Sequence, residues 1–314
     1  MLSRVADRLY WGARYLERSE GLAHAVSAYT QFILDVPKDP RFRWDILIKI
    51  IDGEAGYYSR YSKVTENNVI KYIFLDEENL GSLKASVRFA RENLRTTRDV
   101  LPEEAWELVN ELYLKVNNEV DGAVKRSKRF AFLEEVMLRR LQISGLYDGS
   151  MNRDQSYDFI RLGSYLERCD MTTRMLDIGM RIPAETVENE GEQAESRDIS
   201  LWSNLLDSLS AKGAYRRYIG PIVEPIEVVE FLFKYEEFPR SVRYCLNRIH
   251  RLLSRFNNHS AAIAIVEKMI RKLERFNVRK RSQDEIHAFI DALQYDLIHL
   301  HTKIEATWFN PEKK

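Results

Sequence analysis

Tyr15-Leu16-Glu17-Arg18-Ser19-Glu20 lies in the first long apolar pattern of the chain, and Tyr165-Leu166-Glu167-Arg168-Cys169-Asp170 follows 150 residues later. Both stretches read Tyr-Leu-Glu-Arg, then one variable residue, then an acid. Each lies in a run whose apolar residues repeat with the period of an α-helix. The recurrence predicts an internal repeat in which two related helices carry the same polar signature.

Acidic side chains fall where these helices should be apolar. With about 100° between successive residues, Glu20 and Asp170 lie inside the apolar stripes of their helices, and Glu17 lies at the edge of one. An unpaired carboxylate facing a protein core is very costly, so each needs a cation or hydrogen-bond donors. The arginines of the same stretches are the natural partners, and Asp170 can reach Arg174 within its own helix. We therefore predict that the two helices face each other and form one carboxylate–arginine cluster.

This cluster, with the polar turn that precedes the second signature, gives the candidate site. Its members are Arg14, Glu17, Arg18, Glu20, Arg153, Asp154, Arg161, Glu167, Arg168 and Asp170. The cluster could be a buried ion-pair network that only fixes the register of two helices. Alternatively, its arginines could clamp a carboxylate or phosphate while its carboxylates accept an ammonium, which suits a peptide or an amino acid.

The polar turn from Asp148 to Asp154 has the same two interpretations. Asn152 or Asp154 could simply cap the helix that follows. The turn could instead present hydrogen-bond donors to a ligand beside the cluster.

Signatures of cofactors are missing from the sequence. It contains no Gly-x-x-x-x-Gly-Lys or Gly-x-Gly-x-x-Gly loop for a nucleotide, and no Glu-x-x-His pair for a di-iron bundle. A hard cation would most plausibly bind among the four acids of the two signatures. We expect no metal ion and no cofactor.

Composition bounds the class of protein. The chain has 314 residues, and its 48 basic and 48 acidic residues balance, so net charge favours no particular partner. Its two cysteines lie far apart, which fits neither a disulfide framework nor a zinc site and suits a reducing compartment. We find neither a signal-peptide core nor an apolar run of the ~20 residues that span a bilayer. We therefore expect a cytoplasmic protein without a membrane segment.

The fold class that we predict is all-α, a multi-helix bundle. Low glycine and proline content with abundant Leu, Arg and Glu favours helices. We expect one domain over residues 1–314, built from two related halves at about 1–150 and 151–314. Five glutamates and a proline in residues 182–196 predict an acidic loop. Ser3 should cap a long first helix that runs to about Leu34, and Ser282 with Glu285 should form a capping box for the last.

The residues also resemble the alpha-E domain family, bacterial all-helical proteins with a Glu-Arg motif. The resemblance covers essentially the whole chain. It is carried by 1–6 leading into 15–18, then by 90–93, 148–154 and 165–168, and near the C-terminus by 214–216 and 238–245. The Glu-Arg positions of the family fall on Glu17, Arg18, Glu167 and Arg168. Cys169 stands where a small residue is expected.

The resemblance implies a helical fold and a bacterial cytosolic setting. It also implies an association with ATP-grasp peptide-ligase-like proteins and transglutaminase-like proteins, sometimes with a proteasome-like peptidase. Our leading hypothesis is therefore an accessory protein that serves such a ligase in peptide synthesis or modification, with the cluster as ligand or docking site. The alternative is an enzyme that acts on a peptide or amino acid at the cluster. A third hypothesis, nucleic-acid binding through the basic helices from Arg243 to Arg281, is weakened by the balanced charge.

Overall fold

The computed structural model describes residues 2–35, 43–184 and 191–310, and its regular elements there are helices. The first half comprises α1 (Ser3–Asp35), α2 (Asp45–Ile50), α3 (Glu54–Tyr58), α4 (Glu66–Phe74), α5 (Leu83–Arg95), α6 (Glu103–Ala123) and α7 (Arg126–Ser150). The second comprises α8 (Gln155–Ala184), α9 (Gly191–Ser208), α10 (Lys212–Tyr218), α11 (Pro225–Lys234), α12 (Val242–Leu253), α13 (Ser260–Arg275) and α14 (Gln283–Ile304). A π-helical turn, Glu305–Phe309, follows α14.

The predicted helix boundaries rest on caps that the structure contains. Ser282 accepts a hydrogen bond from the amide of Glu285, whose side chain in turn accepts one from the amide of Ser282, so the predicted capping box is confirmed. Pro225 stands at the first turn of α11, where its missing N–H costs nothing. Ser3, predicted to cap the first helix, is itself the first residue of α1, so this helix starts one residue earlier than the cap implied.

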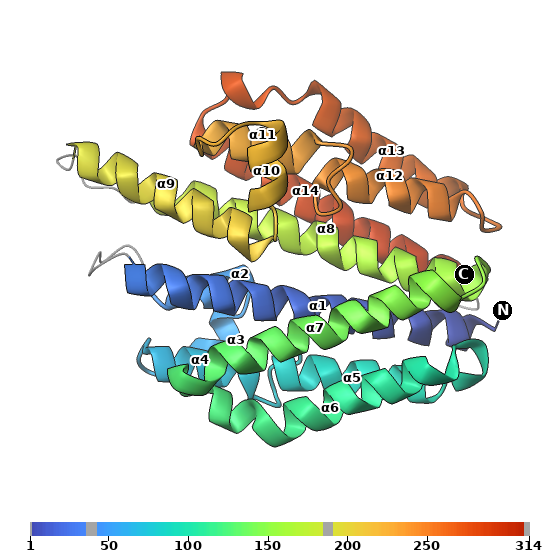
Figure 1. Ribbon diagram of the computed structural model, residues 1–314. Helices are drawn as coiled ribbons and strands as arrows, with labels where there is room; N and C mark the ends of the chain where they lie inside the picture. The colour runs from blue at the N-terminus through green and yellow to red at the C-terminus, as the bar shows by residue number, and fades with distance from the viewer. Residues whose placement is uncertain (1, 36–42, 185–190, 311–314) are drawn as a thin grey trace.

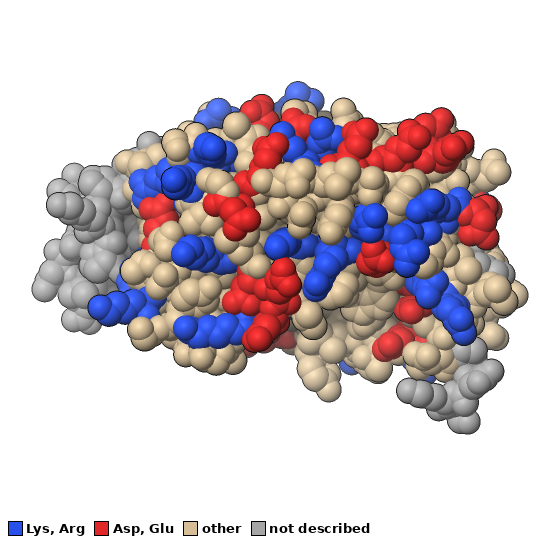
Figure 2. All heavy atoms as spheres, turned by 90° about the horizontal axis from the view of Figure 1, so that it is seen from below, with Lys and Arg blue, Asp and Glu red and all other residues tan. Residues whose placement is uncertain are grey.

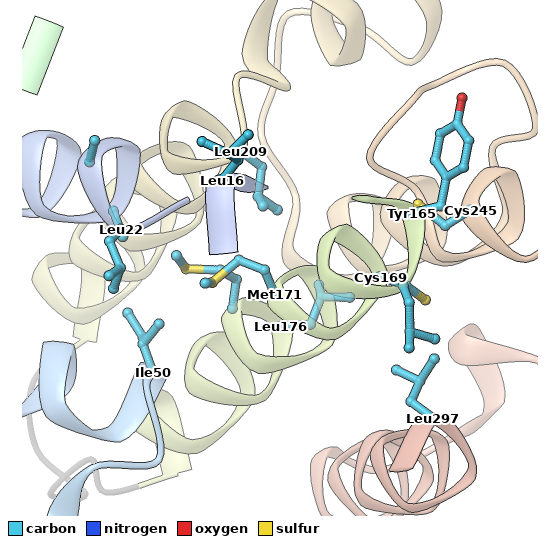
Figure 3. Close-up of a cluster of buried hydrophobic side chains, with 14 of the residues drawn as sticks. Leu16, Leu22, Ile50, Tyr165, Cys169, Met171, Leu176, Leu209, Cys245 and Leu297 are labelled. Atoms are coloured by element: carbon cyan, nitrogen blue, oxygen red, sulfur yellow. The ribbon is translucent and has the colours of Figure 1, made fainter. Parts of the chain in front are cut away.

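Two long helices, α1 and α8, form the centre of the bundle (Figure 1). They run parallel to each other, because Tyr10 meets Gly163 while Gly21 meets Met171 further along both helices. Helices α5 and α7 pack on α1, whereas α12 and α14 pack on α8. The buried apolar side chains of both halves form one continuous core. Figure 3 shows part of it, with Leu22 of α1 and Met171 of α8.

The predicted acidic loop at 182–196 is wrong at both ends. Residues 182–184 continue α8, and residues 191–196 belong to α9. Between them, 185–190 lie outside the described residues. Glu192 and Glu195, two of the glutamates that predicted a loop, belong to α9, and glutamate is a good helix former once a helix has started. None of the helices in the described part of the chain combines the length and apolar composition that a bilayer crossing requires.

The close approach of α1 and α8 depends on Gly163. A Cβ atom at this position would lie 2.3 Å from the carbonyl oxygen of Tyr10, which is backbone and cannot rotate away. We expect Gly163→Ala to lower the free energy of unfolding by about 1–3 kcal/mol, because the two central helices must separate. Urea unfolding measures this difference.

Gly145, on the exposed side of α7, is the matched control, because a Cβ there would meet no atom within 4 Å. Gly145→Ala should be neutral or stabilise by up to about 1 kcal/mol through helix propensity. Equal effects of the two substitutions would contradict the packing argument.

Candidate functional site

The two signatures exchange ion pairs across the contact of α1 and α8. Arg18 Nε donates to Glu167 Oε1 at 2.5 Å, and Arg168 Nε donates to Glu17 Oε1 at 2.6 Å. Each glutamate therefore accepts from the arginine of the other copy. The exchange is possible because the helices are parallel and bring the two copies to the same height. The predicted meeting of the two copies is confirmed in its geometry.

Further arginines complete the cluster. Arg14 Nε donates to Glu167 Oε2 at 2.7 Å, and Arg140 Nη2 of α7 donates to Glu17 Oε2 at 2.9 Å. Arg240, in the turn before α12, donates to Glu20 Oε1 at 2.6 Å. All three glutamates of the cluster are thus paired with arginine.

Sequence reasoning missed Arg140 and Arg240. Arg140 could have been found, because it occupies the apolar stripe of α7 with Leu133, Val136 and Ile143. Arg240 lies in a turn without periodicity, so its place beside the cluster depends on how α12 docks.

The arginines keep the buried glutamates charged. Burial alone disfavours a carboxylate, but Arg168 and Arg140 outweigh it and hold the pKa of Glu17 well below its ordinary value of 4.5. Arg18 and Arg14 likewise overcome burial at Glu167 and lower its pKa to about 2. A carboxylate with so low a pKa is a poor general acid or base near neutral pH. The arginines also occupy the positions that a metal ion would need at these oxygens.

A cavity of about 310 Å³ opens beside the Glu167 side of the cluster. One wall carries charge of both signs, from Arg18, Glu167, Asp170 and Arg174. The other walls are formed by Leu22, Ile50, Ile51, Asp52, Gly53, Gly56, Tyr72, Asn79, Gly81 and Met171. Figure 3 shows Leu22, Ile50 and Met171, which come from three helices and form its apolar part.

Two residues of the opposite wall fix its shape. Tyr72 donates its hydroxyl proton to the carbonyl of Gly53 at 3.0 Å, and a Cβ on Gly56 would lie 2.6 Å from that hydroxyl oxygen. Glycine is therefore required at position 56 for the tyrosine to stand where it does. Asp52 has φ of 53°, a left-handed conformation that lets the chain turn tightly at the rim.

Asp170 faces this cavity rather than the core of the cluster. Its Oδ2 accepts from Arg174 Nε at 2.9 Å, and the two side chains are 19% and 25% exposed. The predicted pair within one helix is confirmed. Because both side chains are accessible, this pair can exchange its partners for those of a ligand.

Three of the predicted site residues lie elsewhere. Asp154 accepts hydrogen bonds from the amides of Ser156 and Tyr157, so it caps α8. Arg153 donates to backbone carbonyls of the preceding turn, and Arg161 donates to the hydroxyl of Tyr165. Their inclusion in the cluster was wrong, because they lie at the start of α8 and their side chains form hydrogen bonds to other groups there.

Other reactive groups lie outside the cavity. Cys169 and Cys245 are free and buried, and burial raises the pKa of both thiols. Asp177, His287 and Asp291 form a separate surface group between α8 and α14. His287 bonds Asp177 through Nδ1, and its Nε2 lies 3.4 Å from Asp291, so both ring nitrogens are engaged.

A comparison with protein families identifies the family to which the chain belongs. A model described as a predicted alpha-helical domain with a conserved ER motif, Alpha-E, matches residues 1–309. This chain belongs to the Alpha-E family. No curated protein and no solved structure matches it. In this Alpha-E protein the Glu-Arg pairs of the two signatures interact, and each glutamate bonds the arginine of the other signature.

Removing Arg168 should destabilise the fold. Arg168→Ala would leave Glu17, whose side chain is 2% exposed, without its closest cation. We expect the free energy of unfolding to fall by about 3 kcal/mol or more. Arg95→Ala is the control, because Arg95 pairs with Glu92 on the surface and should contribute at most about 1 kcal/mol. Similar losses in both variants would contradict the reciprocal pairing as a major source of stability.

Stability should depend on pH in two windows. Burial and the nearby Arg14 lower the pKa of His301 from 6.5 to about 4, so only the unfolded chain gains a proton there between these values. Stability should therefore fall as the pH drops from about 6.5 to 4. It should fall further as the pH drops from about 4.5 to 2, because Glu167 becomes protonated in the unfolded chain but stays ionised in the folded protein.

Urea unfolding between pH 2 and 7 checks both windows. His301→Gln should shrink the upper window and keep the lower one; burial also lowers the pKa of His24, which accounts for the remainder of the upper window. His299→Gln, on the exposed face of α14, should keep both. An upper window that is unchanged in His301→Gln would show that His301 does not contribute to it.

Proposed function

We propose that this Alpha-E protein is an accessory protein of bacterial peptide synthesis or modification. In this proposal, it holds a small peptide or amino acid in the cavity beside the Glu-Arg cluster and serves an ATP-grasp peptide-ligase-like enzyme. The observation that carries the proposal is the charged wall of the cavity, where Arg18 and Arg174 lie next to Asp170 and Glu167.

The charged wall suits a ligand that carries both charges. The guanidinium groups of Arg18 and Arg174 can bind a carboxylate, and Asp170 and Asp52 can accept hydrogen bonds from an ammonium. A volume of about 310 Å³ lies at the small end of ligand pockets and accommodates an amino acid or a short peptide segment. The apolar side chains opposite can pack against a side-chain stem.

Binding is better supported than catalysis. Among the described residues, those that line the cavity include no cysteine, serine, histidine or lysine. Glu167 is held ionised by two arginines, and both cysteines are buried away from it. The alternative, an enzyme acting at the cluster, would have to find its acid, base or nucleophile outside these groups.

Helices α6 and α7 carry exposed leucines that a partner protein can bind. Leu138 and Leu141 of α7 are 49% and 58% exposed, and Leu114 of the adjacent α6 is 48% exposed. Exposed apolar side chains on two neighbouring helices are of the kind that partner proteins cover. This observation favours an accessory protein.

Nucleic-acid binding has less support. Within the basic stretch, six basic side chains are paired with acidic side chains. They are Arg243, Arg255, Arg271, Lys272, Arg279 and Arg281. Figure 2 views the molecule from the side of α5 and α6, away from this stretch, and on that face too basic and acidic side chains are interspersed. Basic side chains that are already ion-paired release few counterions, so these six contribute little to phosphate affinity.

The experiment is recovery of the tagged protein from its host, with mass spectrometry of bound peptides and proteins. Wild type should retain a small peptide or amino acid together with an ATP-grasp-like ligase. Arg174→Glu should lose the small ligand, because it replaces a guanidinium group that binds the carboxylate of the ligand with a carboxylate that repels it. Arg95→Glu, a surface change elsewhere, should keep it.

Two outcomes would contradict the proposal. Retention of the ligand by Arg174→Glu would place it outside the cavity. Turnover of the recovered peptide by the purified protein alone would favour the enzyme.

A further inference from the structure

The two signature glutamates differ in one respect. Among the described residues, Glu17 has three arginines within 4 Å, namely Arg140, Arg168 and Arg240. Glu167 has two, Arg14 and Arg18. The third cation beside Glu17, which also binds Glu20, comes from the turn before α12. The Glu167 side has no such cation.

The turn before α5 matches the turn before α12 in its backbone. Ser82 and Ser241 are both buried, and each hydroxyl accepts from the amide three residues on, at 3.2 and 3.0 Å. Each serine amide also donates to the carbonyl three residues earlier, at 2.8 and 3.0 Å. The residue before the serine is Gly81 in one turn and Arg240 in the other. Glycine thus stands where the matching turn carries the third arginine.

The two turns also occupy matching places in the bundle. Helix α5 packs on α1 and α12 packs on α8, and each preceding turn reaches the carboxylates of the other central helix. Thr172 donates to the carbonyl of Arg240 at 2.8 Å. Leu22, 150 residues before Thr172, lines the cavity together with Gly81. The cavity beside Glu167 therefore occupies the position that corresponds to the Arg240 side chain beside Glu17.

The carboxylates of the cavity are less satisfied than their counterparts. Glu20 binds Arg240 at 2.6 Å, and its second oxygen lies 3.7 Å from Arg140. Asp170, its counterpart, pairs with Arg174 through Oδ2, and its Oδ1 has no hydrogen-bond partner among the described residues. The lining carries two arginines and three carboxylates, the third from Asp52, and Arg14 also bonds Glu167. The unpaired oxygen of Asp170 is therefore the position where the cavity can receive a donor group.

We infer that the cavity receives the guanidinium group of a ligand, as in an arginine side chain of a peptide. The inference rests on the proposed ligand-holding function and specifies the ligand class. The group would lie against Asp170 and Glu167 as Arg240 lies against Glu20 and Glu17. A planar guanidinium can donate to two carboxylates at once, and its aliphatic stem can pack on Ile50, Ile51 and Met171.

Calorimetry with three blocked amino acids tests the ligand class. The probes are the N-acetyl amides of arginine, lysine and glutamine, which differ in their side chains but carry no terminal charges. The arginine probe should bind at least tenfold more tightly than the glutamine probe, and more tightly than the lysine probe. Asp170→Asn should weaken the arginine probe at least tenfold, and Asp207→Asn, at a surface ion pair, should not.

A substitution at Gly81 tests the site from within. A Cβ there would meet only Asn79 Oδ1, at 3.3 Å, so a side chain can be added. Gly81→Arg should abolish binding of the arginine probe and raise the melting temperature above that of Gly81→Met by about 2 °C or more. Both variants fill space, but only arginine can pair with Asp170. Adding Asp170→Asn to Gly81→Arg should remove the gain.

The outcomes separate this inference from the proposed function. Equal affinity for the arginine and glutamine probes, or tighter binding of lysine, would overturn the guanidinium assignment. If the arginine probe fails while wild type still retains a peptide that Arg174→Glu loses, the inference falls and the proposed function stands. If neither probe nor peptide binds, both fall.

Discussion

The structure depends on one interaction, the reciprocal pairing of two buried glutamates with arginines on the opposite central helix. A carboxylate that is 2–3% exposed must have a cation beside it. Because each glutamate finds that cation on the other helix, α1 and α8 can pack in one register only. Gly163 then allows the two backbones to approach as closely as these bonds require. The outer helices cover a pair of central helices whose relative position is already fixed.

The same pairing separates the structural part of the cluster from the part that can act. Glu17 and Glu167 bond arginine through both oxygens and stay ionised, so these ion pairs form the rigid, structural part of the cluster. Asp170 and Arg174 are the accessible pair at its edge. A ligand can therefore change its partners at the edge without disturbing the register of the central helices. Function is located in such a site rather than in the fold itself.

Differences between the two halves are what open the cavity. Around Glu17 and Glu20, Arg140 and Arg240 supply cations from outer elements. Around Glu167 and Asp170, the outer turn supplies Gly81 instead. The segment at residues 52–56 and Tyr72 then form a wall over the gap. If the outer turns placed an arginine beside both glutamates, no space would remain beside Glu167. The cavity and the unequal number of arginines therefore have the same origin.

The sequence by itself determined the all-α fold, the capping box of the last helix and the meeting of the two signatures. Helical periodicity and caps are local, and a buried carboxylate demands a cation wherever it lies. Arg140 could have been read from the same periodicity. Only the tertiary structure decided that Arg153, Asp154 and Arg161 stand apart, and that Arg240 and the cavity lie beside the cluster. Turns have no period, so their place depends on how the helices dock, which is a property of the whole packed bundle.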